Sequence, residues 1–150
     1  MLLMNDDMAF LIGDVSRLMR RRFDERARRI GVTRQQWRVL LKLGRHEGAT
    51  QGTLAELLEV EPITLCRMVD RLVEAHLVER RRDPADRRAW NIYLTDRAYP
   101  LIDKLRGVAD ALFVEVMDGI ERDALQAMGD TLAQLRTNLQ AATPKEEAHG

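Results

Sequence analysis

The stretch that decides the fold is QGTLAELLEVEPITLCRMVDRLVEAHLVERRRDPADRRAWNIYLT, residues 51–95. The spacing of its apolar residues changes once, at residue 77. Before residue 77, apolar side chains recur at steps of three and four, which predicts two helices, the second over 62–76. From there on, Val, Trp, Ile and Tyr lie in two short runs, 77–82 and 88–94, separated by the turn-forming residues Asp83-Pro84-Ala85-Asp86. The stretch therefore predicts a helix-turn-helix followed by a two-stranded hairpin.

Two further helices are expected before this stretch. Apolar residues at three- and four-residue steps follow Asn5, which should open a long amphipathic helix that closes at Gly31. Thr33 has Gln36 three residues later, the spacing of a capping box, so a second helix should begin there and end near Gly44.

Polar residues also predict where the remaining helices begin. Thr50 can cap the short helix behind it, and Thr95 is expected to cap a helix that is interrupted at Gly119. The leucines and methionine of 125–139 step by three and four, which is typical of a helix-packing seam. Residues 143–150 are polar and are expected to form a disordered tail.

Together these elements predict an all-α protein with a small β-wing, in one unit over residues 1–150. A winged helix-turn-helix lobe occupies 33–95, and N- and C-terminal helices at 1–32 and 96–142 flank it. The flanking helices have apolar stripes without an obvious partner in the chain, so we expect them to dimerise. A two-fold homodimer would place two reading helices about one turn of DNA apart.

Charge is balanced in total, with 24 basic and 24 acidic residues, but it is uneven along the chain. Residues 17–29 hold seven arginines against two acids, a net charge of +5, so a polyanion partner is not excluded. The chain has one cysteine, Cys66, no apolar run that could span a bilayer and no basic start typical of a secretory signal. These features predict a cytoplasmic protein.

The central stretch resembles the core of the MarR (multiple antibiotic resistance regulator) family of winged-helix transcription factors. Its flanking helices extend the likeness to nearly the whole length. The residues that carry the likeness are Leu54-Ala55, Val60, Thr64-Leu65, Arg67, Val69-Asp70-Arg71-Leu72, Leu77-Val78-Glu79-Arg80, Asp83-Pro84-Ala85-Asp86-Arg87-Arg88 and Leu94-Thr95.

This resemblance implies a regulator that binds a pseudo-palindromic operator in double-stranded DNA and is released by a small phenolic or carboxylate effector. The helix over 62–76 would read the major groove, and Arg88 would enter the minor groove at the wing, with Asp86 orienting the wing arginines. On the helix, three side chains fall away from the apolar stripe and can face DNA. The candidate DNA-binding residues are therefore Thr64, Arg67, Arg71, Arg82, Arg87 and Arg88.

Three positions depart from the family pattern. His76 stands where the family usually has Gly, and His tolerates the left-handed backbone better than most residues. Ala98 replaces another Gly, with Pro100 close behind, which could distort the start of the next helix. Cys66 lies on the recognition helix itself, where the family commonly has Ser or Thr.

By the same resemblance, Arg17, Arg20 and Trp37 are candidates for the effector site, where an indole face and a cation would hold an aromatic acid. For the arginines of 17–29 the alternative is a salt-bridged helix face, because pairs such as Arg21/Glu25 stand four residues apart. Trp37 could equally belong to the core.

Two other functions stay open: a winged-helix interaction module without DNA binding, and a regulator that senses oxidants through Cys66. An enzyme is not expected, because Ser16 is the only serine and lacks an activating partner. No pattern indicates a cofactor or a metal site, since His46 has no second ligand at helical spacing.

Overall fold

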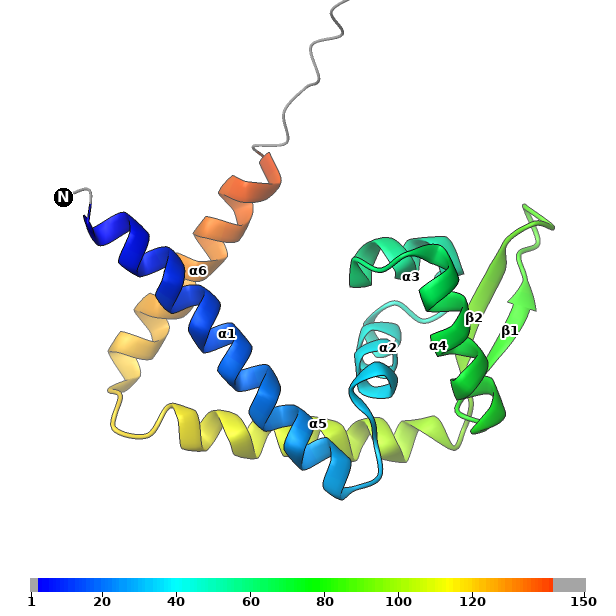
Figure 1. Ribbon diagram of the computed structural model, residues 1–150, viewed down its shortest axis with the longest axis horizontal. Helices are drawn as coiled ribbons and strands as arrows, with labels where there is room; N and C mark the ends of the chain where they lie inside the picture. The colour runs from blue at the N-terminus through cyan, green and yellow to red at the C-terminus, as the bar shows by residue number, and fades with distance from the viewer. Residues whose placement is uncertain (1–2, 142–150) are drawn as a thin grey trace, which may run out of the picture. The chain divides into compact units, whose positions relative to one another are not determined.

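The computed structural model describes residues 3–141, which form six helices and a two-stranded antiparallel sheet (Figure 1). The all-α fold with a small β-wing is confirmed. The described chain divides into two compact units, with the boundary after Leu112 inside the fifth helix. In chain order the elements are α1 (Leu3–Arg29), α2 (Arg34–Arg45), α3 (Gln51–Leu58), α4 (Pro62–Glu74), β1 (Val78–Arg82), β2 (Trp90–Leu94), α5 (Ala98–Val116) and α6 (Arg122–Ala141).

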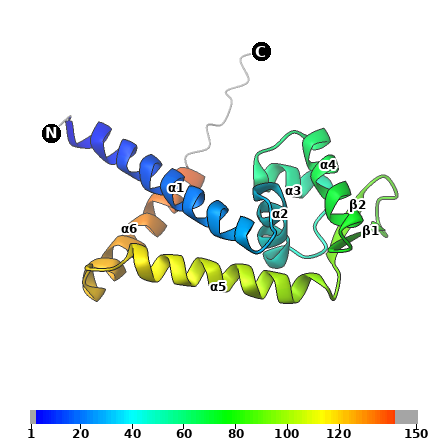
Figure 2. The ribbon, with the colours of Figure 1, turned by 60° about the horizontal axis from the view of Figure 1, so that its bottom comes forward.

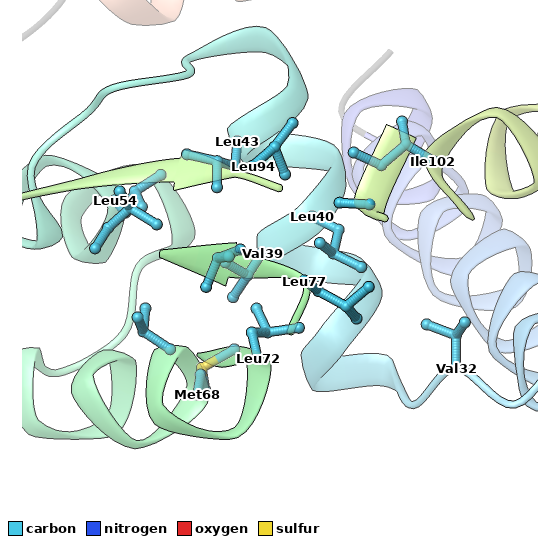
Figure 3. Close-up of a cluster of buried hydrophobic side chains, with 14 of the residues drawn as sticks. Val32, Val39, Leu40, Leu43, Leu54, Met68, Leu72, Leu77, Leu94 and Ile102 are labelled. Carbon is cyan, nitrogen blue, oxygen red and sulfur yellow. The ribbon is translucent and has the colours of Figure 1, made fainter. Parts of the chain in front are cut away.

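The core of the first unit lies among α2, α3, α4 and the hairpin. Figure 3 shows Val39 and Leu40 of α2 and Leu72 of α4 pointing toward the same apolar space as Leu77 and Leu94. Each fully buried side chain of this size contributes about 1.5–3 kcal/mol relative to exposure, so these contacts hold the helix-turn-helix together. The largest fully buried residues are Val39, Leu40, Leu43, Leu54, Leu65, Val69, Leu72, Ile92 and Leu105.

Local capping residues determine where α2, α3 and α4 begin, as the sequence predicts. The Thr33 side chain accepts from the Gln36 N–H, and the Gln36 side chain accepts from the Thr33 N–H, which completes the capping box. Thr50 caps α3 by accepting from the Thr53 N–H at 3.1 Å. Pro62 occupies the first turn of α4, where its missing N–H has no helical partner to lose.

The hairpin turn is longer than the sequence predicts, because aspartate side chains bind its backbone. Asp83 Oδ1 accepts from the N–H of Ala85 (2.7 Å) and of Asp86 (3.0 Å). Asp86 Oδ1 in turn accepts from the N–H of Arg88 at 3.0 Å. The second strand therefore begins at Trp90, and Arg88, expected as its first residue, lies in the turn.

A short segment before α3 extends the sheet by hydrogen bonds that no sequence pattern indicates. The Gly48 N–H donates to the Ile92 carbonyl, and the Ile92 N–H donates to the Ala49 carbonyl, both at 2.9 Å. Gly48 has a φ of +83°, and a Cβ there would lie 3.2 Å from the Tyr93 hydroxyl oxygen. The positive φ favours glycine at this position, and a side chain there would also press on the Tyr93 ring.

The junction between the hairpin and α5 corrects the expected role of Thr95. Its hydroxyl donates to the His76 carbonyl at 2.6 Å instead of capping a helix, and α5 begins only at Ala98. His76 has a φ of 58°, the left-handed conformation that the sequence predicts after the recognition helix. Ala98 is fully buried, and Pro100 lies in the first turn, so α5 forms without the anticipated distortion.

Both terminal helices are long and largely exposed. α1 begins at Leu3, two residues before the expected start at Asn5, and ends at Arg29 just before Gly31, as expected. In the second unit, α6 carries the predicted leucine seam, but none of its described residues is buried. The tail expected over 143–150 lies outside the described residues.

Candidate nucleic-acid interface

One face of α4 is exposed and carries the three candidate DNA-binding residues of this helix. Thr64, Arg67 and Arg71 are all exposed, while Leu65 and Leu72 on the opposite face are buried in the core. This division follows from the helical repeat, which places positions three and four apart on the same side. The exposed face is therefore free to enter a groove without unpacking the lobe.

The hairpin lies beside α4 (Figure 2). Its exposed arginines belong to the same lobe. Arg87 and Arg88 are exposed in the turn, and within the described part of the chain only their backbone groups, not their guanidinium groups, are hydrogen-bonded. Arg82 is also exposed, but its Nη1 donates to the Arg87 carbonyl at 2.6 Å and its guanidinium lies 4.5 Å above the Trp90 ring. Arg82 thus braces the turn, and Arg87 and Arg88 are the ones available to a ligand.

Asp86 acts on the wing through the backbone. Its carboxylate accepts from the Arg88 N–H, a charge-assisted bond that fixes the point from which the Arg88 side chain leaves the turn. Asp83 supports the same turn, and the N–H groups of Ala85 and then Asp86 lower the pKa of its carboxyl below 3.8, with the Asn91 side chain adding to this effect. The turn is therefore held by an ionised Asp83.

The structure reveals an organising residue that is not among the site residues expected from the sequence. Arg80, with 21% of its side chain exposed, reaches from β1 to both helices of the helix-turn-helix. Its Nε donates to Gln51 Oε1 of α3 at 2.6 Å, and its Nη2 donates to the Cys66 carbonyl (3.1 Å) and to Asp70 Oδ1 (2.5 Å) of α4. Strand alternation gave the available signal, because Arg80 stands two residues from the buried Val78 and so shares its face.

Cys66 is partly buried beside this linkage. Its sulfur lies 3.8 Å from Arg80 Nη2, in addition to the bond that its carbonyl accepts. The thiol therefore contacts the guanidinium that joins the wing to α4.

Trp37, a candidate for the effector site, joins α1 to α2. Its Nε1 donates to Asp24 Oδ1 at 2.6 Å, and its ring meets Phe23 edge to face with centroids 4.7 Å apart. Asp24 Oδ2 also lies 3.9 Å from Arg34 Nε, so the Asp24 carboxylate contacts two residues of α2.

The other two effector candidates are exposed on α1. Arg17 pairs with Asp14 at 3.3 Å, and Arg20 is exposed one turn further along. The expected salt-bridged face is present at Arg21, whose Nε lies 3.8 Å from Glu25 Oε1. The structure thus places Arg17 and Arg20 on the surface and Trp37 in a packed contact.

Neither a membrane span nor a metal cluster is found among the described residues. No helix there has the length and apolar character needed to cross a bilayer. Within the same residues, no three His, Cys, Asp or Glu side chains come together as metal ligands would.

A helix-turn-helix whose second helix exposes arginines beside an arginine-rich hairpin defines the winged helix-turn-helix class, a DNA-binding fold. A family model for the MarR family matches residues 30–89. The chain is 33% identical to the transcriptional regulator PA3341, covering 89% of this chain and 98% of that one, with a TM-score of 0.79. This chain belongs to the MarR family of transcriptional regulators.

Other solved structures agree with this assignment. A MarR-family regulator from Rhodococcus sp. RHA1 is 28% identical, with 87% of this chain and 93% of that chain covered and a TM-score of 0.75. A mutant of MarR from E. coli in which a cysteine is replaced by serine, complexed with operator DNA, is 25% identical, with 86% and 93% covered and a TM-score of 0.74.

Proposed function

We propose that the protein is a repressor that binds a pseudo-palindromic DNA operator as a homodimer and leaves it when a small effector binds. The observation that carries the proposal is the exposed arginine pair of α4, Arg67 and Arg71, on the same lobe as the exposed wing arginines. The E. coli MarR mutant that was solved with operator DNA supports it, because that protein shares this fold.

In this proposal the α4 face reads bases and the wing grips the backbone and minor groove. Arg67 and Arg71 can each donate two hydrogen bonds to O6 and N7 of a guanine, contacts worth about 1–3 kcal/mol of discrimination each. Arg88, on the turn, is suited to a narrow minor groove, whose negative potential attracts a guanidinium. Helix and wing would thus supply sequence preference and affinity respectively.

Homodimerisation is supported by two sets of exposed apolar residues, one in each compact unit. A 20-residue helix such as α6, with an apolar seam and none of its described residues buried, needs a partner surface in water. The exposed apolar residues are Met8, Leu11, Ile12, Val15 and Leu18 on α1, and Met128, Leu132, Leu135 and Leu139 on α6. Sedimentation equilibrium should give a dimer mass, and a Leu132→Glu/Leu135→Glu variant should shift it toward monomer.

Effector release would follow from differential binding to two arrangements of the dimer. In one arrangement the spacing between the two recognition helices does not match successive major grooves. A ligand that binds this arrangement more tightly increases its population and so lowers the affinity for DNA. Arg17 and Arg20 are exposed cations on α1, and Trp37 is an aromatic group further along the same α1–α2 region. Benzoate and 2-hydroxybenzoate are suitable probes, and Arg20→Ala should weaken their effect on the DNA complex.

The deciding experiment is fluorescence anisotropy with DNA from upstream of the protein's own coding region, against scrambled DNA, over a salt series. We expect selective binding that falls steeply as salt rises, because each phosphate contact releases counterions. Arg67→Ala and Arg71→Ala should reduce the preference for specific over scrambled DNA. Equal binding to both DNAs, on several promoters and in reductant, would favour a protein-interaction module instead.

A second candidate, oxidant sensing, is favoured by one observation. Cys66 Sγ lies 3.8 Å from Arg80 Nη2, so oxidation of the thiol would act directly on the residue that joins the wing to α4. Peroxide should then release the DNA complex in the wild type but not in Cys66→Ser. Release that persists in Cys66→Ser would exclude this mechanism.

A further inference from the structure

One large apolar side chain of the winged lobe is mostly exposed although the lobe buries the others. Ile63 has 64% of its surface exposed, and the next such residue within 31–97 is Leu57 of α3 at 37%. The remaining large aliphatic residues of this lobe are buried or half-buried around the core. Ile63 is therefore the position at which the lobe presents an apolar group to its surroundings.

This residue stands on the part of the lobe that would meet base edges. Ile63 is the second residue of α4, and the helical repeat places it on the same face as Arg67, four residues later. Leu65 and Leu72, on the opposite face, are fully buried, so Ile63 cannot turn into the core without unwinding α4. In helix-turn-helix proteins the N-terminal residues of the second helix contact bases in the major groove.

We propose that Ile63 is a specificity-determining residue that packs against the C5 methyl group of a thymine. Thymine is the only base that presents a methyl group in the major groove, and an aliphatic side chain recognises it by apolar contact. Ile is β-branched and therefore stiff at χ1, so it holds its methyl groups in place with little further loss of freedom. This inference rests on the proposed function and names one base that the helix reads.

The chemistry also distinguishes Ile63 from its neighbours on the same face. Arg67 and Arg71 can bind a guanine or a phosphate, and Thr64 can donate to or accept from any base. The Ile63 side chain has no hydrogen-bonding or charged group, so it can neither bind a phosphate nor form hydrogen bonds with a guanine. Its contribution to DNA binding must therefore depend on an apolar group of the DNA.

The test replaces thymine by deoxyuridine, which removes the methyl group and keeps every hydrogen-bonding atom. In vitro selection from a random duplex library with the full-length protein first defines the preferred sequence. Each thymine of that sequence is then replaced in turn, and binding is measured by anisotropy for the wild type, Ile63→Ala and Ile63→Val. Leu57→Ala, which shortens the other exposed aliphatic residue of the lobe, is the matched control.

We expect one thymine in each half-site at which deoxyuridine weakens wild-type binding by about fourfold, the value for one buried methyl-sized group. Ile63→Ala should bind thymine and deoxyuridine equally there, Ile63→Val should keep part of the difference, and Leu57→Ala should keep all of it. If Ile63→Ala responds to every replacement as the wild type does, the inference is wrong while DNA binding stands. Selection that enriches no sequence would instead overturn the proposed function, and this inference with it.

Discussion

The Asp70 carboxylate of α4 accepts a hydrogen bond from Arg80 Nη2 of β1 at 2.5 Å, and this pair links the recognition helix to the wing. Arg80 also binds Gln51 of α3, so one guanidinium spans three elements of the lobe. The helix and the wing therefore keep a fixed relative position. Because this position is fixed, the proposed DNA contacts of the helix and of the wing can form at the same time.

Removing the Arg80 side chain should loosen the lobe. Hydrogen bonds to a charged group contribute about 1.5–3 kcal/mol, and the partners of Arg80 can partly regain water, so Arg80→Ala should lower the free energy of unfolding by about 1.5–3 kcal/mol. Urea denaturation followed by circular dichroism measures this change. Arg80→Lys should recover little of it, because an ammonium group cannot reproduce the planar fork of donors.

Arg81→Ala is the matched control for that experiment. Arg81 lies on the same strand and is exposed, with its side chain paired to Glu79 and stacked over Tyr93. Exposed pairs of this kind contribute about 0–1 kcal/mol. If Arg81→Ala destabilises the protein as much as Arg80→Ala does, the three-element linkage is not what stabilises the lobe.

The wing turn should weaken in acid because of Asp83. Its pKa in the folded protein lies below 3.8, mainly because the Ala85 N–H donates to it. A carboxyl with a lowered folded pKa contributes stability above its unfolded pKa and loses it as the pH falls through the folded value. NMR titration should therefore show the Ala85 and Asp86 amide signals changing at a lower pH than is usual for an aspartate carboxyl. A midpoint raised above the usual range of aspartate would contradict the hydrogen bonds assigned to the turn.

Local signals were sufficient to predict most of the fold. The capping box at Thr33, the cap at Thr50 and Pro62 in the first turn of α4 each depend on residues within one turn of the chain. His76 also takes the left-handed conformation expected of it. Such interactions are fixed by sequence neighbours, so their geometry follows from the residue types alone.

Contacts between distant residues were not predictable in the same way. The Gly48 N–H donates to the Ile92 carbonyl and the Ile92 N–H donates to the Ala49 carbonyl. These bonds join segments more than 40 residues apart, and no periodicity in the sequence indicates them. The hydrogen bond from Trp37 Nε1 to Asp24 Oδ1 also joins two helices, and the residue spacing within α1 does not indicate it. The partners of Arg80 were not predictable either, because Gln51 and Asp70 lie 29 and 10 residues away along the chain.

Replacing Arg88 or Arg82 of the wing by Ala should have different effects, on DNA binding alone for Arg88 and also on the structure of the turn for Arg82. Arg88 has an exposed side chain in the turn, so Arg88→Ala should weaken binding to all DNA sequences and reduce the salt slope by about 1, without loss of stability. Arg82 binds the Arg87 carbonyl and covers Trp90, so Arg82→Ala should also make the Trp90 environment more polar. Tryptophan fluorescence in a Trp37→Phe background measures this change. An unchanged salt slope in Arg88→Ala would remove Arg88 from the interface.

The Asp24–Trp37 hydrogen bond should contribute measurably to the contact between α1 and α2. Trp37→Phe removes the donor and keeps a ring next to Phe23, and Asp24→Ala removes the acceptor. A double-mutant cycle on unfolding free energies should give a coupling of about 1–2 kcal/mol, as expected for a part-buried bond to a charged group. A coupling near zero would mean that ring packing alone holds α1 against α2.

Replacing His76 by glycine should stabilise the protein. His76 has a φ of 58°, and the left-handed conformation costs an L-residue about 1–2 kcal/mol, whereas glycine adopts it freely. Glycine also gains about 0.5–1 kcal/mol of freedom in the unfolded chain, so the net stabilisation should be about 0–1.5 kcal/mol. The bond that Thr95 donates to residue 76 is retained, because its acceptor is the backbone carbonyl.

The neighbouring residue provides the control for this substitution. Ala75 has a φ of −79°, so Ala75→Gly gains no conformational relief and should lower the unfolding free energy by about 0.5–1 kcal/mol. Urea denaturation of the two variants should therefore give changes of opposite sign. If His76→Gly is destabilised as much as Ala75→Gly, the imidazole contributes a stabilising contact larger than the backbone strain, and the left-handed position is maintained by the side chain.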